Sequence, residues 1–474
     1  MKYLIDSSIQ MGLALQHTLE QLRMEEFPSD SPRVFGDLLL SLTNHILDRL
    51  LDLASEEREP PPVIPQAEAA LLARSLAQIA HSARPVAGSN SDFVPWAMVH
   101  PVEMLCREIS PESRVIIFPR WTYNYGYYEA IAPLKRLMDG IATGTGEDFF
   151  KGRPQYYAVL SFPAVEGYHI LQNAAWGHEI GHHADTVFSV SERVMREPLI
   201  DQGDIDLEIA DLLPAGPDRE QILRSSGEVL RLQAMEKAAW LTRRWVRELV
   251  ADIFSIHVFG PASLFAFASI VPVMHSLDQP DLEYPPARLR LQTMLREVRE
   301  LEYDHIVDEE PTTETQQSVR SALASELARL QALADQEPSE QVKPEYLPAL
   351  KASQAAIPLI KECIAEVPKE RWACSAGLLR RDVFGLFERL EHDVPPCEVE
   401  EVGKLVGRQT RLAAIINAGW LYQLAQRPRT PPQSLAEAVQ RRDRARQING
   451  LTLKAIELSE IRRQLGVTEA IRGS

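Results

Sequence analysis

The sequence predicts a mainly α-helical (α+β) fold with one small β-sheet. Apolar residues recur at intervals of three and four along most of the chain, which is the spacing of amphipathic helices. β-branched and aromatic residues gather in only two segments, 113–128 and 155–162, and this composition is typical of strands. With 474 residues, the chain is long enough for about two to four domains that each bury a core.

Residues 1–90 are predicted to form a helical N-terminal region. Residues 35–54 have one apolar and one polar face at helical spacing, and the same pattern resumes over residues 66–83. Between these segments, the prolines of residues 59–65 interrupt any helix because proline lacks the backbone N–H that a helix interior uses.

Residues 91–304 are predicted to form a single core region that carries the chemistry. Both strand segments fall here, and the second one ends at Pro163. A long helical pattern begins after this proline and contains the segment WGHEIGHHAD, residues 176–185. This motif is therefore expected on a helix that follows a strand.

The remainder of the chain is predicted to be helical. Residues 305–345 are charged and contain prolines, which indicates a linker with a helix. Residues 346–474 are predicted to form a helical C-terminal domain, with ordinary amphipathic spacing in residues 451–465, for example.

Composition excludes several classes of partner. The net charge of −17 argues against general nucleic-acid binding, because phosphates would be repelled. The most apolar region, residues 249–277, is broken by charged residues and prolines, so no membrane-spanning helix is expected. Four cysteines without a CxxC pair indicate reduced thiols. We expect a cytoplasmic protein that binds neither nucleic acid nor a membrane.

The segment WGHEIGHHAD contains the spacing of a zinc site. His178 and His182 are four residues apart, so on a helix they lie one turn apart on the same face and can bind one zinc ion. Glu179 is then placed as a general base that takes a proton from a water activated by the metal. The alternative is an ordinary helix with surface or core histidines, because a chance HExxH is not rare.

Two glycines flank the histidines of this segment. A glycine inside a helix is about 1 kcal/mol less favourable than alanine, so Gly177 and Gly181 need a compensating role. We expect them to permit a close backbone approach on either side of the predicted ligands.

A third ligand is expected further along the chain. The extension of the metzincin class is absent, because Asp185 and Phe188 occupy its positions. Glu248 and Asp252 are one helical turn apart among apolar neighbours, and acids in such a setting need partners. We predict that Glu248 ligates zinc and that Asp252 hydrogen-bonds a ligand histidine. The alternative is a solvated helix face.

HEIGH followed by ELVAD resembles the gluzincin zinc metallopeptidases. The segment around Ala251 is similar to the ExxAD segment of the CAAX-prenyl-protease group, and YPPARLR, residues 284–290, is similar to its His-Pro-Pro stretch. Tyr284 stands where that group has His, and its transmembrane helices are missing. The resemblance covers about residues 156–290 and implies a zincin-like core with a small β-sheet, flanked by the helical N- and C-terminal regions.

A peptidase also needs a donor that stabilises the oxyanion of the tetrahedral intermediate. The candidates are Tyr123, Tyr125, His257 and Arg290, and the sequence does not choose among them.

Two functional hypotheses follow. The first is a zinc-dependent metallohydrolase, a peptidase that acts on a peptide or protein substrate. The second is a helical interaction or regulatory protein built on a metallopeptidase core, with zinc in a structural role and a regulatory partner protein bound through the helical arms. An intact Glu179 favours the first hypothesis, because a structural site needs no general base.

Overall fold

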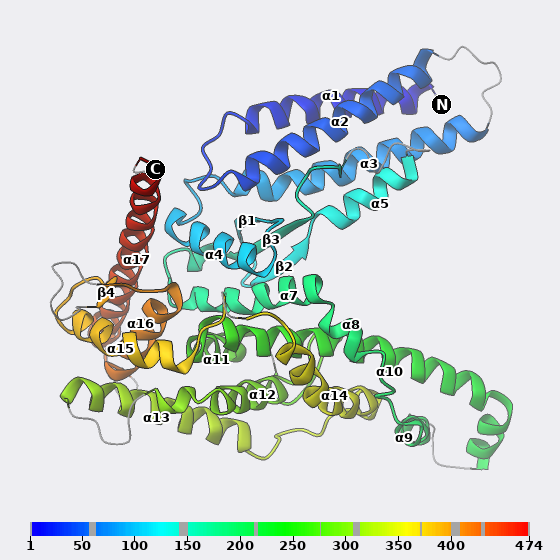
Figure 1. The fold of residues 1–474 in the computed structure, drawn as a ribbon. Helices are drawn as coiled ribbons and strands as arrows, with labels where there is room; N and C mark the ends of the chain where they lie inside the picture. The colour runs from blue at the N-terminus through cyan, green and yellow to red at the C-terminus, as the bar shows by residue number, and fades with distance from the viewer. Residues whose placement is uncertain are drawn as a thin grey trace. The chain divides into compact units, whose positions relative to one another are not determined.

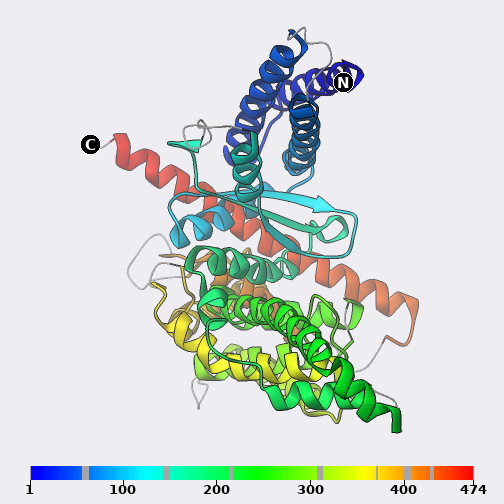
Figure 2. The same ribbon diagram turned by 90° about the vertical axis from the view of Figure 1, so that its right-hand side faces the viewer.

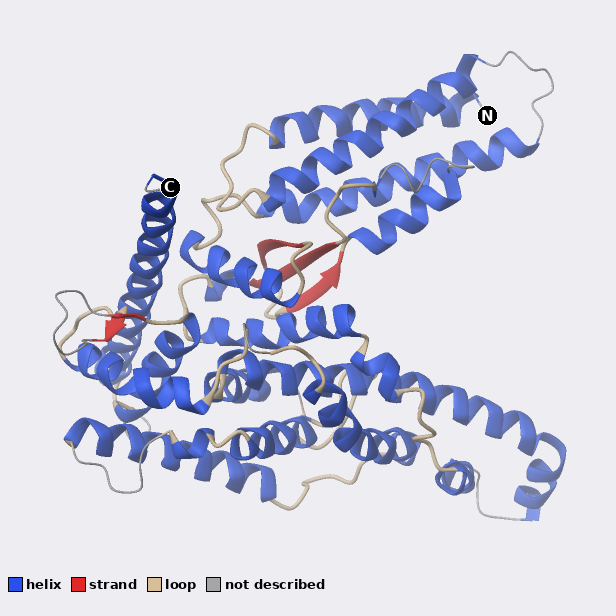
Figure 3. Cartoon of the chain, in the orientation of Figure 1, coloured by secondary structure: helices blue, strands red, loops and turns tan. Residues whose placement is uncertain are grey.

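A computed structural model describes residues 2–55, 63–141, 150–212, 217–274, 276–306, 313–369, 372–399, 408–427 and 432–472. It confirms the predicted class: 73% of the structure is helical, and there is one small three-stranded sheet (Figure 3). By its contacts, the chain divides into two compact units, Met1–Gly167 and Tyr168–Ser474. The predicted boundaries at residues 90, 304 and 345 remain predictions.

The first unit combines long helices with the three-stranded sheet. The helices α1, α2 and α3 lie side by side, as Figures 1 and 2 show. The elements of this unit are α1 (Lys2–Leu22), α2 (Ser31–Ser55), α3 (Val63–Gly88), α4 (Trp96–Ile109), β1 (Ser113–Arg120), β2 (Gly126–Glu129), α5 (Ile131–Ile141), β3 (Tyr156–Pro163) and the short 3-10 helix η1 (Ala164–Glu166). Of the predicted proline break at residues 59–65, residues 59–62 lie outside the described residues, and α3 begins at Val63.

The sheet has the order β1-β3-β2, with β3 in the middle. β3 pairs in parallel with β1 and antiparallel with β2. Its residues after Tyr156 are all buried, as expected for a central strand of β-branched and aromatic residues. The core of the unit joins this sheet to the helices, and the rings of Phe35 and Tyr157 have centroids 4.7 Å apart.

The second unit is helical and contains the HExxH segment. In Figure 1, α7 and α10 run next to each other, and α17 is a single long helix that Figure 2 shows along its length. The elements are η2 (Gln172–Ala175), α7 (Trp176–Phe188), α8 (Val190–Val194), α9 (Gln202–Leu212), α10 (Pro217–Phe259), α11 (Pro261–Met274), α12 (Ala287–Glu300), η3 (Tyr303–His305), α13 (Glu314–Asp335), η4 (Pro344–Tyr346), α14 (Leu347–Ala365), α15 (Ala376–Glu391), β4 (Glu398–Val399), β5 (Arg408–Gln409), α16 (Leu412–Ala425) and α17 (Leu435–Arg472).

The second unit also contains strands that the sequence does not predict. The pairing of β4 with β5 adds a second, two-stranded ladder outside the segments predicted as strands. Strands of two residues have no detectable alternation, so the sequence pattern does not reveal them.

Within the described part of the chain, every helix is too short or too polar to cross a membrane.

A buried asparagine fixes the corner between α10 and α11. The chain turns at Gly260, whose φ of 62° favours glycine. Asn417 of α16 is fully buried; its Nδ2 donates to the carbonyl of Phe259 at 2.6 Å, and its Oδ1 accepts from the backbone N–H of Ala262 at 3.0 Å. One side chain therefore satisfies two backbone groups at the end of the helix that carries Glu248.

We predict that Asn417→Ala lowers the free energy of unfolding by about 2–4 kcal/mol, because it leaves two buried backbone groups without partners. Chemical denaturation followed by circular dichroism measures this change. The exposed Gln464→Ala serves as the control and should change stability by less than about 0.5 kcal/mol. Equal stability of the two variants would contradict the role of Asn417.

Candidate metal centre

Helices α7 and α10 approach so closely that their contact tolerates almost no side chain. A Cβ atom on Gly181 would lie 2.6 Å from the carbonyl oxygen of Ala251. A Cβ atom on Gly177 would lie 2.8 Å from Ser263 Oγ and 2.9 Å from the ring of Phe259. This confirms the expected close backbone approach at Gly181, whereas the absent side chain of Gly177 makes room for the side chains of Ser263 and Phe259.

This contact brings three ligand atoms together. His178 and His182 project from α7, and Glu248 projects from α10. His178 Nε2 lies 3.2 Å from Glu248 Oε2, and His182 Nε2 lies 3.4 Å from Glu248 Oε1. The three donor atoms all lie within 4.8 Å of one another. Among the described residues, this is the group of His, Cys, Asp or Glu side chains that could hold a metal ion.

The three side chains are largely but not completely buried. His178 is 16% exposed, His182 is 12% exposed and Glu248 is 13% exposed. Two imidazoles and one carboxylate are a donor set that fits a divalent metal and leaves a coordination position open. Each of the three side chains therefore keeps some exposure to solvent.

Asp252 orients one of the two histidines. Its Oδ1 lies 2.8 Å from His178 Nδ1, which holds a hydrogen on that nitrogen and turns Nε2 toward Glu248. Asp252 is fully buried. The structure therefore contains the predicted hydrogen bond between Asp252 and a histidine of the HExxH segment, and that histidine is His178.

Arg290 of α12 neutralises Asp252. Its Nε donates to Asp252 Oδ2 at 2.8 Å and its Nη2 donates to Asp252 Oδ1 at 2.7 Å, which is a bidentate pair. The same guanidinium lies 3.8 Å from Glu248 Oε2 and over the rings of Phe267 and Tyr284. In the structure, the guanidinium of Arg290, a candidate oxyanion donor at the end of the YPPARLR segment, pairs with Asp252.

These contacts determine the charges of the acids. Burial by itself raises the pKa of Glu248, but the histidines outweigh it and hold the pKa well below its ordinary value. Burial likewise acts on Asp252, where Arg290 outweighs it and lowers the pKa. Burial alone lowers the pKa of His178, but hydrogen bonds to Asp252 and Glu248 raise it to about 10. Both carboxylates are therefore ionised acceptors.

Glu179 is buried beside the ligands on α7. Burial raises its pKa, and the nearby His178 and His182 act in the opposite direction. This carboxyl group is thus electrostatically coupled to the same histidines that could hold the metal.

The predicted oxyanion donors have other partners. Tyr123, in the first unit, donates to Glu166 Oε1 at 2.7 Å, and Tyr125 is buried in the same unit. His257 is buried against Glu297, with its Nε2 3.1 Å from Glu297 Oε1. Their proposed role at an oxyanion remains a prediction.

Asp185 belongs to the helix junction. Its two oxygens accept hydrogen bonds from the backbone N–H and the hydroxyl of Ser191, both at 2.7 Å. It therefore stabilises the start of α8, where Ser189 adopts a φ of 53°.

Comparisons with known proteins give no match: no protein-family model, no curated protein and no solved structure matches this chain significantly.

We predict that Gly181→Ala weakens metal binding at least about 10-fold and lowers the free energy of unfolding by about 1–3 kcal/mol, because the methyl group must push α7 away from Ala251. Metal affinity is measured by competition with a chromophoric chelator. The control is Gly227→Ala in α10, where an added Cβ meets nothing within 4 Å. Unchanged affinity in Gly181→Ala would refute the close-approach argument.

A second prediction concerns Arg290. Arg290→Met leaves Asp252 without its bidentate partner, so metal affinity should fall roughly 10- to 100-fold. The matched control is Arg288→Met, which removes a similarly buried guanidinium that binds Asp278 instead. The control should lose stability but keep metal affinity. If both variants bind metal like the wild type, Arg290 does not support the centre.

Proposed function

We propose that this protein is a zinc-dependent hydrolase that cleaves peptide bonds. His178, His182 and Glu248 would hold the zinc ion, and Glu179 would act as the general base. The observation that carries this proposal is the convergence of two imidazoles from HExxH with a carboxylate from a second helix. The resemblance of HEIGH and ELVAD to gluzincins supports the same assignment.

The donor set favours zinc over harder cations. Zinc prefers nitrogen and carboxylate ligands, whereas magnesium and calcium prefer oxygen ligands alone. A bound zinc ion supplies Lewis acidity, which lowers the pKa of water and polarises a carbonyl group.

The side chains of the protein would transfer the proton and keep the zinc ligands in position. Glu179 takes the proton of the attacking water at its carboxylate and delivers it to the amine nitrogen that leaves. Asp252 keeps the Nδ1 hydrogen of His178 in place, and Arg290 keeps Asp252 ionised. The partial exposure of the three ligand side chains favours an open, catalytic site over a closed, structural one.

The alternative is a structural zinc ion in an interaction or regulatory protein. It differs in one respect that can be tested: a structural site does not need the carboxylate of Glu179. Substituting this residue therefore separates the two functions.

We predict that Glu179→Gln keeps about one zinc ion per chain but loses hydrolysis of a peptide library by roughly 100- to 10,000-fold. Glu248→Ala should lose the metal as well. Zinc is measured by mass spectrometry of the metal, and cleavage is measured by mass spectrometry of the peptides. If zinc-loaded wild type cleaves no peptide, or if Glu179→Gln cleaves as well as wild type, the peptidase proposal fails.

A further inference from the structure

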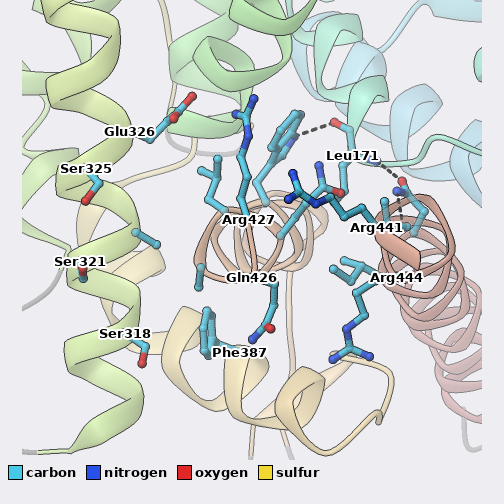
Figure 4. Close-up of a pocket in the computed structure, with 18 of the residues that line it drawn as sticks. Leu171, Ser318, Ser321, Ser325, Glu326, Phe387, Gln426, Arg427, Arg441 and Arg444 are labelled. Carbon is cyan, nitrogen blue, oxygen red and sulfur yellow. Dashed lines mark hydrogen bonds between the residues drawn. The ribbon is translucent and has the colours of Figure 1, made fainter. Parts of the chain in front are cut away.

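A large groove lies within the second unit, away from the three ligand side chains described above. It has a volume of about 1690 Å³ and is lined by residues of α13, α15, α16 and α17 together with the segment before α7. Figure 4 shows Ser318, Ser321 and Ser325 along one wall, on α13, with Gln426 and Arg427 on the facing side. These three serines are three and four residues apart, so their hydroxyl groups lie on one face of α13.

The groove carries no net charge. Four arginines and four glutamates line it, and several of them already form ion pairs with one another, such as Arg329 with Glu326 and Arg441 with Glu437. A site for a phosphate polymer has an excess of cations. The groove therefore lacks the excess of cations that a phosphate polymer needs.

Side-chain amides and hydroxyls dominate the remaining polar surface. Five glutamines, one asparagine and four serines face the groove. Each amide both donates and accepts hydrogen bonds, as each residue of a polypeptide main chain also does. The Oε1 atom of Gln423 is buried and accepts no hydrogen bond from the described residues.

The size of the groove selects among neutral ligands. Sites for small molecules have volumes of about 300–1,000 Å³ and are lined mainly by apolar side chains. This groove is larger, about half of its surface is polar, and its two aromatic residues, Phe387 and Trp420, are buried. These properties match an extended chain with many amide groups.

The groove is also connected to the metal centre within the same unit. Leu171, in its wall, accepts a hydrogen bond from Trp420 Nε1 at 2.8 Å and donates its backbone N–H to Asn449 Oδ1 at 3.1 Å. The next residue, Gln172, begins η2, which leads directly into α7 and His178. A ligand in the groove therefore contacts a segment that is continuous with the metal-binding helix.

We propose that this groove binds an extended segment of an unfolded polypeptide and so selects long, unfolded chains as substrates. The role of the bound chain as a substrate rests on the proposed function, but binding in the groove does not require hydrolysis. Recognition is through the main chain and is therefore tolerant of sequence.

The test uses full-length protein carrying Glu179→Gln, so that binding is measured without cleavage. The probe is fluorescein-labelled, dephosphorylated β-casein, a disordered polypeptide without phosphate groups, and the readout is fluorescence anisotropy. Ser321→Trp, which fills the groove from α13, should raise the Kd at least about 10-fold. The control Ala324→Trp is on the same helix, also exposed, and outside the groove; it should change the Kd less than about 2-fold.

Ser325→Trp, one turn further along α13, should reproduce the effect of Ser321→Trp. If both tryptophan variants bind casein as tightly as the control, the groove proposal is overturned, whether or not the wild type cleaves peptides. If they lose binding while zinc-loaded wild type cleaves nothing, the groove stands and the peptidase proposal fails. Binding of a poly(U) RNA in preference to casein would also overturn the groove proposal.

Discussion

The contact between Gly181 of α7 and the backbone of Ala251 in α10 determines the geometry of the second unit. Helices with ordinary side chains at the contact pack with their axes about 8–10 Å apart. Here a single methyl group on Gly181 would overlap the carbonyl oxygen of Ala251. Because the backbones meet at this point, the side chain of His182, next to Gly181, and that of Glu248, three residues before Ala251, reach each other. The glycines that allow this close contact are each about 1 kcal/mol less favourable in a helix than alanine.

The second requirement is a balance of buried charge. Glu248 and Asp252 lie on α10 among fully buried apolar neighbours, where unpaired carboxylates would be strongly unfavourable. Arg290 provides a compensating charge in a bidentate pair with Asp252, and the histidines provide hydrogen-bonding partners for both acids. The α12 helix is therefore part of the centre although it provides no ligand. The same helix contributes Glu297, whose Oε1 lies 3.1 Å from His257 Nε2, so α10 and α12 are joined by polar contacts at two levels.

Much of this centre could be predicted from the sequence, and the reason is local. His178, Glu179 and His182 lie within one turn, and Glu248 and Asp252 lie within another, so helical periodicity alone defines each pair. The predominance of helices follows from the same periodicity. The pairing of Arg290 with Asp252 could not be derived in this way, because it joins residues of two helices and depends on the tertiary contact. The β4–β5 ladder was missed because its strands have only two residues each. The groove was missed for a related reason: its polar face on α13 looks like any solvated helix face until α16 and α17 are placed opposite it.

The proposal that two imidazoles and one carboxylate bind a single metal ion rests on the group that these side chains form in the structure. X-ray absorption spectroscopy at the zinc edge tests it most directly, on full-length protein loaded with zinc. We expect a first shell of nitrogen and oxygen atoms at about 2.0–2.2 Å, with the outer-shell scattering of two imidazole rings and no sulfur. A sulfur shell near about 2.3 Å, or a spectrum without two imidazoles, would contradict the assignment of His178, His182 and Glu248.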